Sequence, residues 1–282
     1  MKKFVFFLLI LFIFPFTAAA SPRVISLYPG HTDNAAALGA GDRIVAISHN
    51  DDADLLQGLP RLPANVAPEA ILAHKPDIVL LRGLNERASP GLIPILTKAG
   101  AAVHVVEPPS WEGFEGYLRE LAEILEVGPA HGLAELARIR EQAAEAAKHR
   151  TKNPLVFMEA TGREIHTCSP DSWAARLIEL CGGVNAAHGA KPVRPGSAIA
   201  PWGVERAVML AGEGLDIYLV QQGAMNASSR ADVLARPWFA AFADTRLAFI
   251  EERSLSRPSL LGLERGVAAL LGILYPEATP AP

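Results

Sequence analysis

The sequence predicts an α/β protein in which two Rossmann-like lobes with parallel sheets are joined by a single long α-helix. Short apolar runs of β-type residues alternate with helical segments, and these runs lack the polar alternation of a half-exposed strand. Such runs indicate parallel sheets covered on both faces. The pattern restarts in the second half of the chain, after a stretch of strong helix formers. We place the first lobe at 21–127, the connecting helix at 128–152 and the second lobe at 153–277.

The first twenty residues are typical of a secretory signal peptide. Lys2 and Lys3 precede an apolar run at 4–16, and three alanines at 18–20 form a small-residue cleavage site. The apolar run is short for a membrane span, although an uncleaved anchor helix is the alternative. No cysteine follows the run directly, so we expect no lipid anchor. We therefore expect an exported, periplasmic protein that starts near Ser21.

The charge of the chain argues against a nucleic-acid partner. The net charge is −4, and no basic surface of the kind that binds nucleic acid is apparent, so we expect no nucleic-acid partner.

Cys168 and Cys181 are the only cysteines. After export they could form a disulfide, or they could be two buried thiols that pack as small apolar groups. A metal site formed by both is a third alternative, but no CxxC or Cys/His spacing accompanies them.

The first lobe contains four predicted strands. They are expected at 23–27, 44–48, 77–81 and 102–106, with helices at 34–38, 68–73, 92–99 and 114–125. Tyr28-Pro29-Gly30 forms a turn after the first strand, and Gly39 and Gly41 end the first helix.

The connecting helix has recognisable ends. Pro129 suits the first turn, and Lys148, His149 and Arg150 suit the last turn, where cations interact favourably with the helix dipole. A helix of about 20 residues spans roughly 30 Å. Such a helix would form a stiff connection between the lobes.

The second lobe repeats the alternation of strands and helices. Strands are expected at 155–158, 216–220 and 247–250, and helices at 172–180, 202–211 and 259–274. In open parallel sheets, ligands bind beyond the carboxyl ends of the strands. In this chain those ends carry polar residues in both halves, at 28–31, 49–52, 82–86, 107, 159–161 and 221–222. The sequence therefore predicts a ligand cleft between two facing lobes.

Several segments, in order along the chain, resemble periplasmic substrate-binding proteins for vitamin B12, ferric siderophores and heme. They are RVISL at 23–27, LGAGDRIVAIS at 38–48, PEAILAHKPDIVL at 68–80, CGGVN at 181–185, and RPS at 257–259 followed by GLE at 262–264. The resemblance covers nearly all of the chain after residue 20. It implies two lobes joined by one long helix, little closure motion, a metal-chelate ligand and an ABC importer permease as partner. We expect a monomer without a cofactor.

The resemblance is strongest to the cobalamin-binding branch of this family. Residues 200–205, APWGVE, are similar to a stretch in which a tryptophan walls the cleft and a glutamate follows three residues later. By position, the resemblance implies that Glu69 and Glu205 dock onto arginines of the permease. Both residues lie at the start of short predicted helices. The helix dipole favours a carboxylate there, and the carboxylate can pair with an arginine. Asn50, Pro63 and Leu81 stand where that branch has aromatic residues. The expected ligand is a corrinoid or a ferric siderophore, and heme ranks next.

Three aromatic residues and one arginine are candidates for contact with a flat chelate. Tyr28, Trp111 and Trp202 could pack against a macrocycle, and each could equally be a core or surface aromatic. Arg82 suits an anionic chelate, or else a surface salt bridge.

Polar residues near the first two strand ends offer a different chemistry. His31, His49, Asp51 and Asp52 combine imidazole and carboxylate groups, which could bind a bare divalent metal or an exposed iron, and Asn50 is a further candidate for contact with the ligand. Their spacing matches no closed metal motif, so the chelate contact is preferred and uptake of a bare metal ion is the alternative.

Catalytic motifs are absent from the sequence. It contains no GxSxG, HExxH or GxxxxGK[ST] pattern. We therefore expect a binding protein and no enzyme, the alternative being a chelatase-like periplasmic enzyme on a similar frame.

Overall fold

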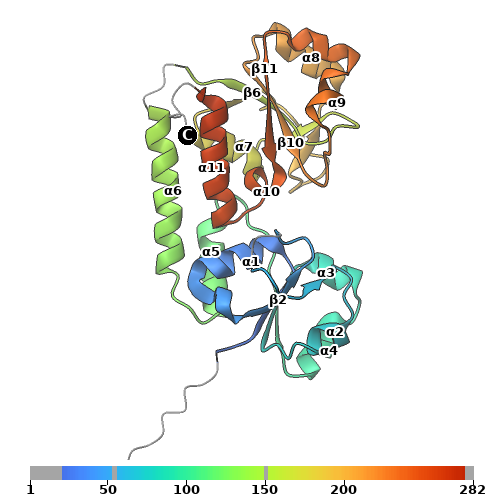
Figure 1. The fold of residues 1–282 in the computed structure, drawn as a ribbon, viewed down its shortest axis with the longest axis vertical. Coiled ribbons are helices and arrows are strands. Elements are labelled where there is room, and N and C mark those ends of the chain that lie inside the picture. The colour runs from blue at the N-terminus through green and yellow to red at the C-terminus, as the bar shows by residue number, and fades with distance from the viewer. Residues whose placement is uncertain (1–20, 53–55, 149–151, 277–282) are drawn as a thin grey trace, which may run out of the picture.

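The computed structural model describes residues 21–52, 56–148 and 152–276 and shows two α/β lobes stacked one above the other (Figure 1). The predicted signal peptide and the last residues of the predicted connecting helix lie outside the described residues. None of the described helices is long and apolar enough to cross a membrane. The predicted fold class is confirmed, and the lobe boundaries stay a prediction.

The first-lobe sheet has five parallel strands in the order β3-β2-β1-β4-β5. Their bounds are β1 Val24–Ser26, β2 Ile44–Ser48, β3 Arg61–Leu62, β4 Ile78–Leu81 and β5 Ala102–Val105. Every residue of β1 and β4 is buried, as expected of strands covered on both faces. The two-residue strand β3 was not predicted, because so short a run carries no periodicity.

Helices cover both faces of this sheet. They are α1 Pro29–Ala35, α2 Pro68–Leu72, α3 Gly83–Ala88, α4 Leu92–Lys98 and α5 Phe114–Ile124. Successive strand residues point to opposite faces, so Val24 belongs to the buried cluster that contains Phe114 of α5, whereas Ile25 belongs to the cluster that contains Leu92 of α4. The first helix begins at Pro29, earlier than predicted, because proline fits the first helical position directly after the extended Tyr28.

The second-lobe sheet has four parallel strands in the order β11-β10-β6-β8. These are β6 Leu155–Glu159, β8 Val184–Asn185, β10 Ile217–Gln222 and β11 Arg246–Glu251, and a separate antiparallel pair is formed by β7 His166–Cys168 and β9 Ile199–Pro201. The helices are α7 Trp173–Leu180, α8 Val204–Gly212, α9 Arg230–Leu234, the 3-10 helix η3 Pro237–Phe242, α10 Glu252–Leu255 and α11 Leu260–Leu274.

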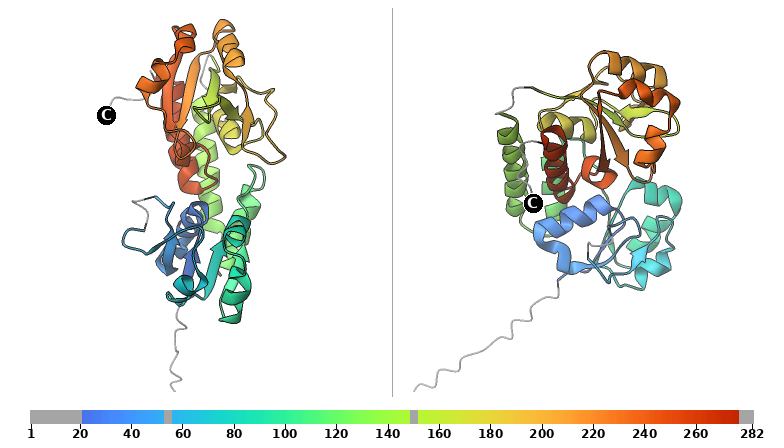
Figure 2. Two further views of the ribbon diagram at one scale, coloured as in Figure 1. Left: turned by 90° about the vertical axis from the view of Figure 1, so that its right-hand side faces the viewer. Right: turned by 45° about the horizontal axis from the view of Figure 1, so that its top comes forward.

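Two long helices lie side by side along one edge of the molecule and connect the lobes (Figures 1 and 2). The chain crosses between the lobes through α6 Ala130–Lys148, as predicted, and α11 packs alongside it. The approach is close, since a Cβ on Gly132 of α6 would lie 2.8 Å from Leu38 and 3.5 Å from Leu260. One apolar core contains residues of both lobes and both helices, so the lobes are packed together as well as tethered.

Candidate functional site

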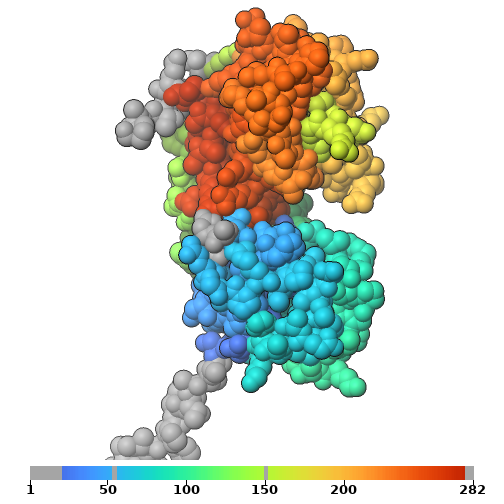
Figure 3. Space-filling model, turned by 45° about the vertical axis from the view of Figure 1, so that its right-hand side comes forward, coloured from blue at the N-terminus to red at the C-terminus, as the bar shows by residue number. Residues whose placement is uncertain are grey.

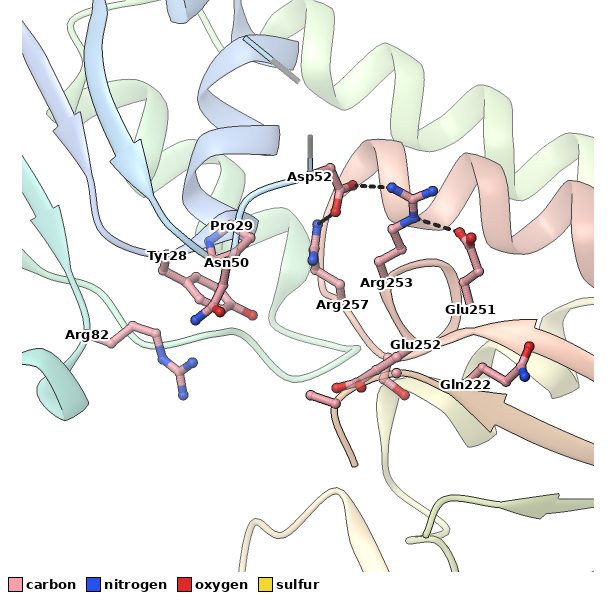
Figure 4. Close-up of a pocket in the computed structure, with 13 residues that line it drawn as sticks. Tyr28, Pro29, Asn50, Asp52, Arg82, Gln222, Glu251, Glu252, Arg253 and Arg257 are labelled. Atoms are coloured by element: carbon pink, nitrogen blue, oxygen red, sulfur yellow. Dashed lines mark hydrogen bonds and ion pairs between the residues drawn. The ribbon is translucent and has the colours of Figure 1, made fainter. Parts of the chain in front are cut away.

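A cavity of about 580 Å³ lies between the lobes at the carboxyl ends of both sheets (Figures 3 and 4). The first lobe contributes residues that follow β1, β2 and β4, and the second contributes residues at the ends of β10 and β11 and from the turn of α10. The lining residues are Tyr28, Pro29, Asn50, Asp52, Arg82, Gln222, Gly223, Ala224, Glu251, Glu252, Arg253, Ser256 and Arg257. This is the position at which open parallel sheets bind ligands.

Tyr28 and Arg82 form one wall of the cavity. The Arg82 guanidinium carbon lies 4.5 Å from the centroid of the Tyr28 ring, which is a cation–π arrangement. Burial raises the pKa of the Tyr28 phenol, and the charges of Arg82 and Arg257 oppose this shift. The hydroxyl is therefore protonated and can donate a hydrogen bond. Gly30 makes room for the ring, because a Cβ there would lie 2.5 Å from Tyr28 Cε1.

The floor of the cavity is an ion-pair network between the lobes. Asp52 lies after β2, and its carboxylate is within 3.2 Å of Arg257, 3.4 Å of Arg253 and 3.3 Å of Arg265. The loop that carries Asp52 is held by Arg61, whose guanidinium donates hydrogen bonds of 2.6 and 2.8 Å to the backbone carbonyls of Asp51 and Asp52. Three arginines of the second lobe thus converge on one carboxylate of the first.

Beneath this floor, the start of α11 is hydrogen-bonded to α1. Ser259 caps α11 by accepting a hydrogen bond from the backbone of Gly262 at 3.0 Å, and it donates one to Asp33 at 2.9 Å. The Asn34 side chain accepts from the Leu260 backbone and donates to the Pro258 carbonyl, both at 3.0 Å. Because Ser259 and Asn34 are fully buried, these bonds are shielded from water.

A family model described as periplasmic binding protein matches residues 24–243. The chain belongs to this family. The vitamin B12-binding protein of Yersinia pestis (strain Pestoides F) is 29% identical to it over 173 residues, which are 60% of this chain and 61% of that protein. The chain therefore spans less than two thirds of this curated relative's length.

Solved structures of other periplasmic binding proteins share the fold. The heme-binding protein HutB of Vibrio cholerae has a TM-score of 0.71 and 20% identity, covering 91% of this chain and all of the other. A heme-binding protein from Pseudomonas aeruginosa gives 0.68 and 22%, covering 93% and 95%. The vitamin B12-binding protein BtuF of Vibrio cholerae gives 0.59 and 20%, covering 90% and 97%. At identities this low, the similarity shows a shared fold and does not assign a ligand to this chain.

Four of the candidate ligand residues line the cavity, and one of them is Asp52 of the alternative metal site. Tyr28, Asn50 and Arg82 each follow the end of a first-lobe strand. Their contact with a ligand stays a prediction. His49 is exposed in the same turn as Asn50 and is not among the lining residues.

His31 is part of the protein interior, and this corrects its prediction as a ligand contact. The side chain is fully buried in α1, with Nδ1 2.8 Å from the Tyr117 hydroxyl and Nε2 3.0 Å from the Val106 carbonyl oxygen. Burial lowers the pKa of His31 to about 4, so the imidazole is neutral at physiological pH. Both ring nitrogens are engaged in holding α1 against α5 and the end of β5.

Asp51 is also buried, in contrast to its prediction as a ligand contact. Burial raises the pKa of its carboxyl to about 7, against the opposing influence of Thr32 and Arg257. Neither carboxylate oxygen has a hydrogen-bond partner of good geometry. Over the described ranges, no three His, Cys, Asp or Glu residues are arranged to hold a metal ion.

The two predicted tryptophans lie away from the cavity lining. Trp111 packs edge-on against Trp173 of the second lobe, with ring centroids 4.7 Å apart, and therefore contributes to the contact between the lobes. Trp202 packs against Phe157 and lies beneath the guanidinium of Arg206 at 4.5 Å. Neither residue lines the cavity of this structure, and the contact of either tryptophan with a ligand stays a prediction.

The remaining predictions concern docking and cysteines. Glu69 and Glu205 are exposed in the first turns of α2 and α8, one on each lobe. The disulfide considered for Cys168 and Cys181 is not formed, and both are buried free thiols. Each packs in the apolar core, where desolvation raises the thiol pKa, to about 11 for Cys168 and about 12 for Cys181.

Several lining residues of the second lobe were missed from the sequence. The last predicted strand ends at residue 250 and is directly followed by Glu251, Glu252 and Arg253. Strand β10 is directly followed by Gly223 and Ala224. The rule that ligands bind at the carboxyl ends of strands predicts Glu251, Glu252 and Arg253 when it is applied to the last predicted strand as well.

Proposed function

We propose that this protein captures a metal-chelate nutrient in the cleft between its lobes and delivers it to the permease of an ABC importer. The observation that carries this proposal is the cavity at the carboxyl ends of both sheets, because a ligand there contacts both lobes at once. Membership of the periplasmic binding protein family supports it, as do relatives named for vitamin B12 and heme binding.

The chemistry of the lining favours an oxygen-rich chelate with anionic groups. Tyr28 is the only aromatic among the described lining residues, whereas Arg82 presents a guanidinium that can bind carboxylate, phosphate or catecholate oxygens. We place a corrinoid or a ferric siderophore first and heme second, because heme requires more apolar contact on both faces than this cavity offers.

Docking to the permease is proposed to use Glu69 and Glu205. Both carboxylates are exposed near helix N-termini on opposite lobes, so two arginines of one permease could engage them together. In this proposal residues 1–20 direct export to the periplasm, and the protein acts there as a monomer, without a cofactor or catalytic activity.

The test is a ligand panel on the chain from residue 21. Cyanocobalamin, cobinamide, hemin, several ferric siderophores and divalent metals are screened by thermal shift, and responding ligands are titrated by absorbance. A ligand at 100 times its dissociation constant stabilises the folded state by about 2.7 kcal/mol. We expect one chelate to respond and Arg82→Gln to weaken its binding at least tenfold, whereas Arg119→Gln, on the exposed surface of α5, leaves it unchanged. A response to bare metals alone would indicate metal-ion uptake, and turnover of a chelate would indicate an enzyme.

A further inference from the structure

Glu252 lines the cavity, and its side chain packs very closely against Gly223. It is the first residue of α10, directly after β11. A Cβ on Gly223 would overlap the Glu252 carboxylate and lie 2.5 Å from its Cβ. Only glycine at position 223 therefore allows the Glu252 side chain to lie across the loop that follows β10. Figure 4 shows the side chain reaching into the cavity towards the first lobe.

The other two carboxylates of the cavity lining are paired. Asp52 has three arginine partners, and Glu251 lies 2.6 Å from Arg253. Within the described residues, Glu252 has neither an ion-pair partner nor a side-chain hydrogen bond, although it is half-buried. Its acceptor oxygens are thus available to a ligand.

Arg82 provides the complementary group on the first lobe. Its ion pair with Glu107 is long, 3.8 Å from Nε to Oε2, and it leaves the outer edge of the guanidinium facing the cavity. Arg253 and Arg257, by contrast, are already held by Asp52 on the floor. The cavity therefore offers one donor-rich group and one acceptor group on opposite lobes.

We propose that Glu252 determines specificity by binding a protonated amine or similar strong donor on the chelate, while Arg82 binds the chelate's acceptor oxygens. The preferred ligand is then a chelate that carries both an oxygen-rich metal-binding part and a cationic group. This inference rests on the proposed function and deepens it. A donor placed against Glu252 replaces the lost hydration of the carboxylate, which a neutral apolar group cannot do.

The test compares two ferric hydroxamate probes that differ in one charge. Ferrioxamine B carries a free ammonium, and its N-acetylated form does not. Dissociation constants of both are measured by fluorescence quenching for the wild-type chain and for Glu252→Gln. We expect the wild-type chain to prefer ferrioxamine B at least tenfold, and Glu252→Gln to reduce this preference below threefold. Glu213→Gln, exposed after α8, is the matched control and keeps the preference. Melting temperatures establish that each variant is folded.

The outcomes separate this inference from the proposed function. If the wild-type chain binds both probes equally, or if Glu252→Gln keeps the preference, the role of Glu252 is overturned and the importer role stands. Binding of another chelate of the panel without binding of ferrioxamine B overturns it as well. If no chelate binds at all, the proposed function fails, and the inference about Glu252 fails with it.

Discussion

Ser259 donates a hydrogen bond of 2.9 Å to Asp33 and thereby joins the first turn of the last helix to the first helix of the chain. The two residues are 226 positions apart and both are buried. The same Ser259 oxygen accepts from the Gly262 backbone, so a single hydroxyl both caps α11 and attaches it to the opposite lobe. The contact between the lobes therefore depends on directional bonds as well as on apolar packing.

Replacing Ser259 by alanine should destabilise the fold more than losing an ordinary helix cap. The substitution removes the cap and leaves the Asp33 oxygen with one partner fewer in a buried place, for a total of about 2–3 kcal/mol. Ser229→Ala is the matched control, since Ser229 caps the exposed helix α9 and its loss should cost about 1 kcal/mol. Urea unfolding measures both. Equal losses would show that the bond to Asp33 contributes nothing.

Asp51 should make the free energy of unfolding depend on pH in an identifiable direction. Its folded pKa, about 7, lies above the usual value, so its contribution to stability is fully present below about pH 4 and is lost as the pH rises through 7. Asp51→Asn should therefore stabilise the protein at pH 8, by about 1–3 kcal/mol, and much less at pH 5.

His31 acts in the opposite direction over part of the same range. Its folded pKa is lowered to about 4, so its contribution is present above about pH 6.5 and is lost as the pH falls towards 4. Because His31 is unchanged in Asp51→Asn, the difference between the two pH profiles isolates Asp51. Parallel profiles for wild type and variant would refute the assignment.

Tyr28→Phe should separate the two contributions of Tyr28 to ligand binding. The variant keeps the ring under Arg82 but removes the hydroxyl donor, so affinity for a chelate should fall about 3- to 15-fold, equivalent to one hydrogen bond. Tyr28→Ala removes both contributions and should cost more. Titration of whichever chelate stabilises the wild-type chain measures this. Unchanged affinity in both variants would place the ligand elsewhere.

Charge reversal at Glu69 and Glu205 should abolish delivery without affecting capture. The variant Glu69→Lys with Glu205→Lys should keep its ligand affinity within twofold, because neither residue lines the cavity. It should fail to stimulate ATP hydrolysis by the importer in proteoliposomes, since lysines would repel the arginines of the permease. Glu213→Lys serves as the charge-matched control. Full stimulation by the double variant would remove these residues from the docking surface.

The architecture could be predicted because each central strand is a continuous apolar run directly followed by a turn. Tyr28 and Arg82 line the cavity for the same reason: each is the second or first residue beyond a strand, where the chain must leave the sheet. His31 lies three residues further, where α1 has already turned inward. Its neighbours Tyr117 and Val106 come from distant parts of the chain. Their proximity to His31 results from the tertiary fold and cannot be predicted from the local sequence.

The second-lobe wall could not be predicted in full because its geometry depends on pairs that are distant in sequence. Glu252 lies across Gly223, and the three arginines of the floor meet at Asp52. Short strands such as β3 and β8 have two residues each and take their conformation from the neighbouring strand. Trp202 was selected because residues 200–205 resemble a cleft-forming stretch of the family, whereas its packing against Phe157 depends on where β9 ends.

The position of α11 has a consequence for the order in which the chain can fold. Leu260 and Leu263 belong by sequence to the last helix, yet they pack in one core with Leu38 and Leu136, and Asn34 binds the backbone at the start of that helix. While the chain is still being synthesised, the first lobe lacks this partner and leaves an apolar face and buried polar groups uncovered. The first lobe is thus completed only after the start of α11, 226 positions beyond Asn34, has been synthesised.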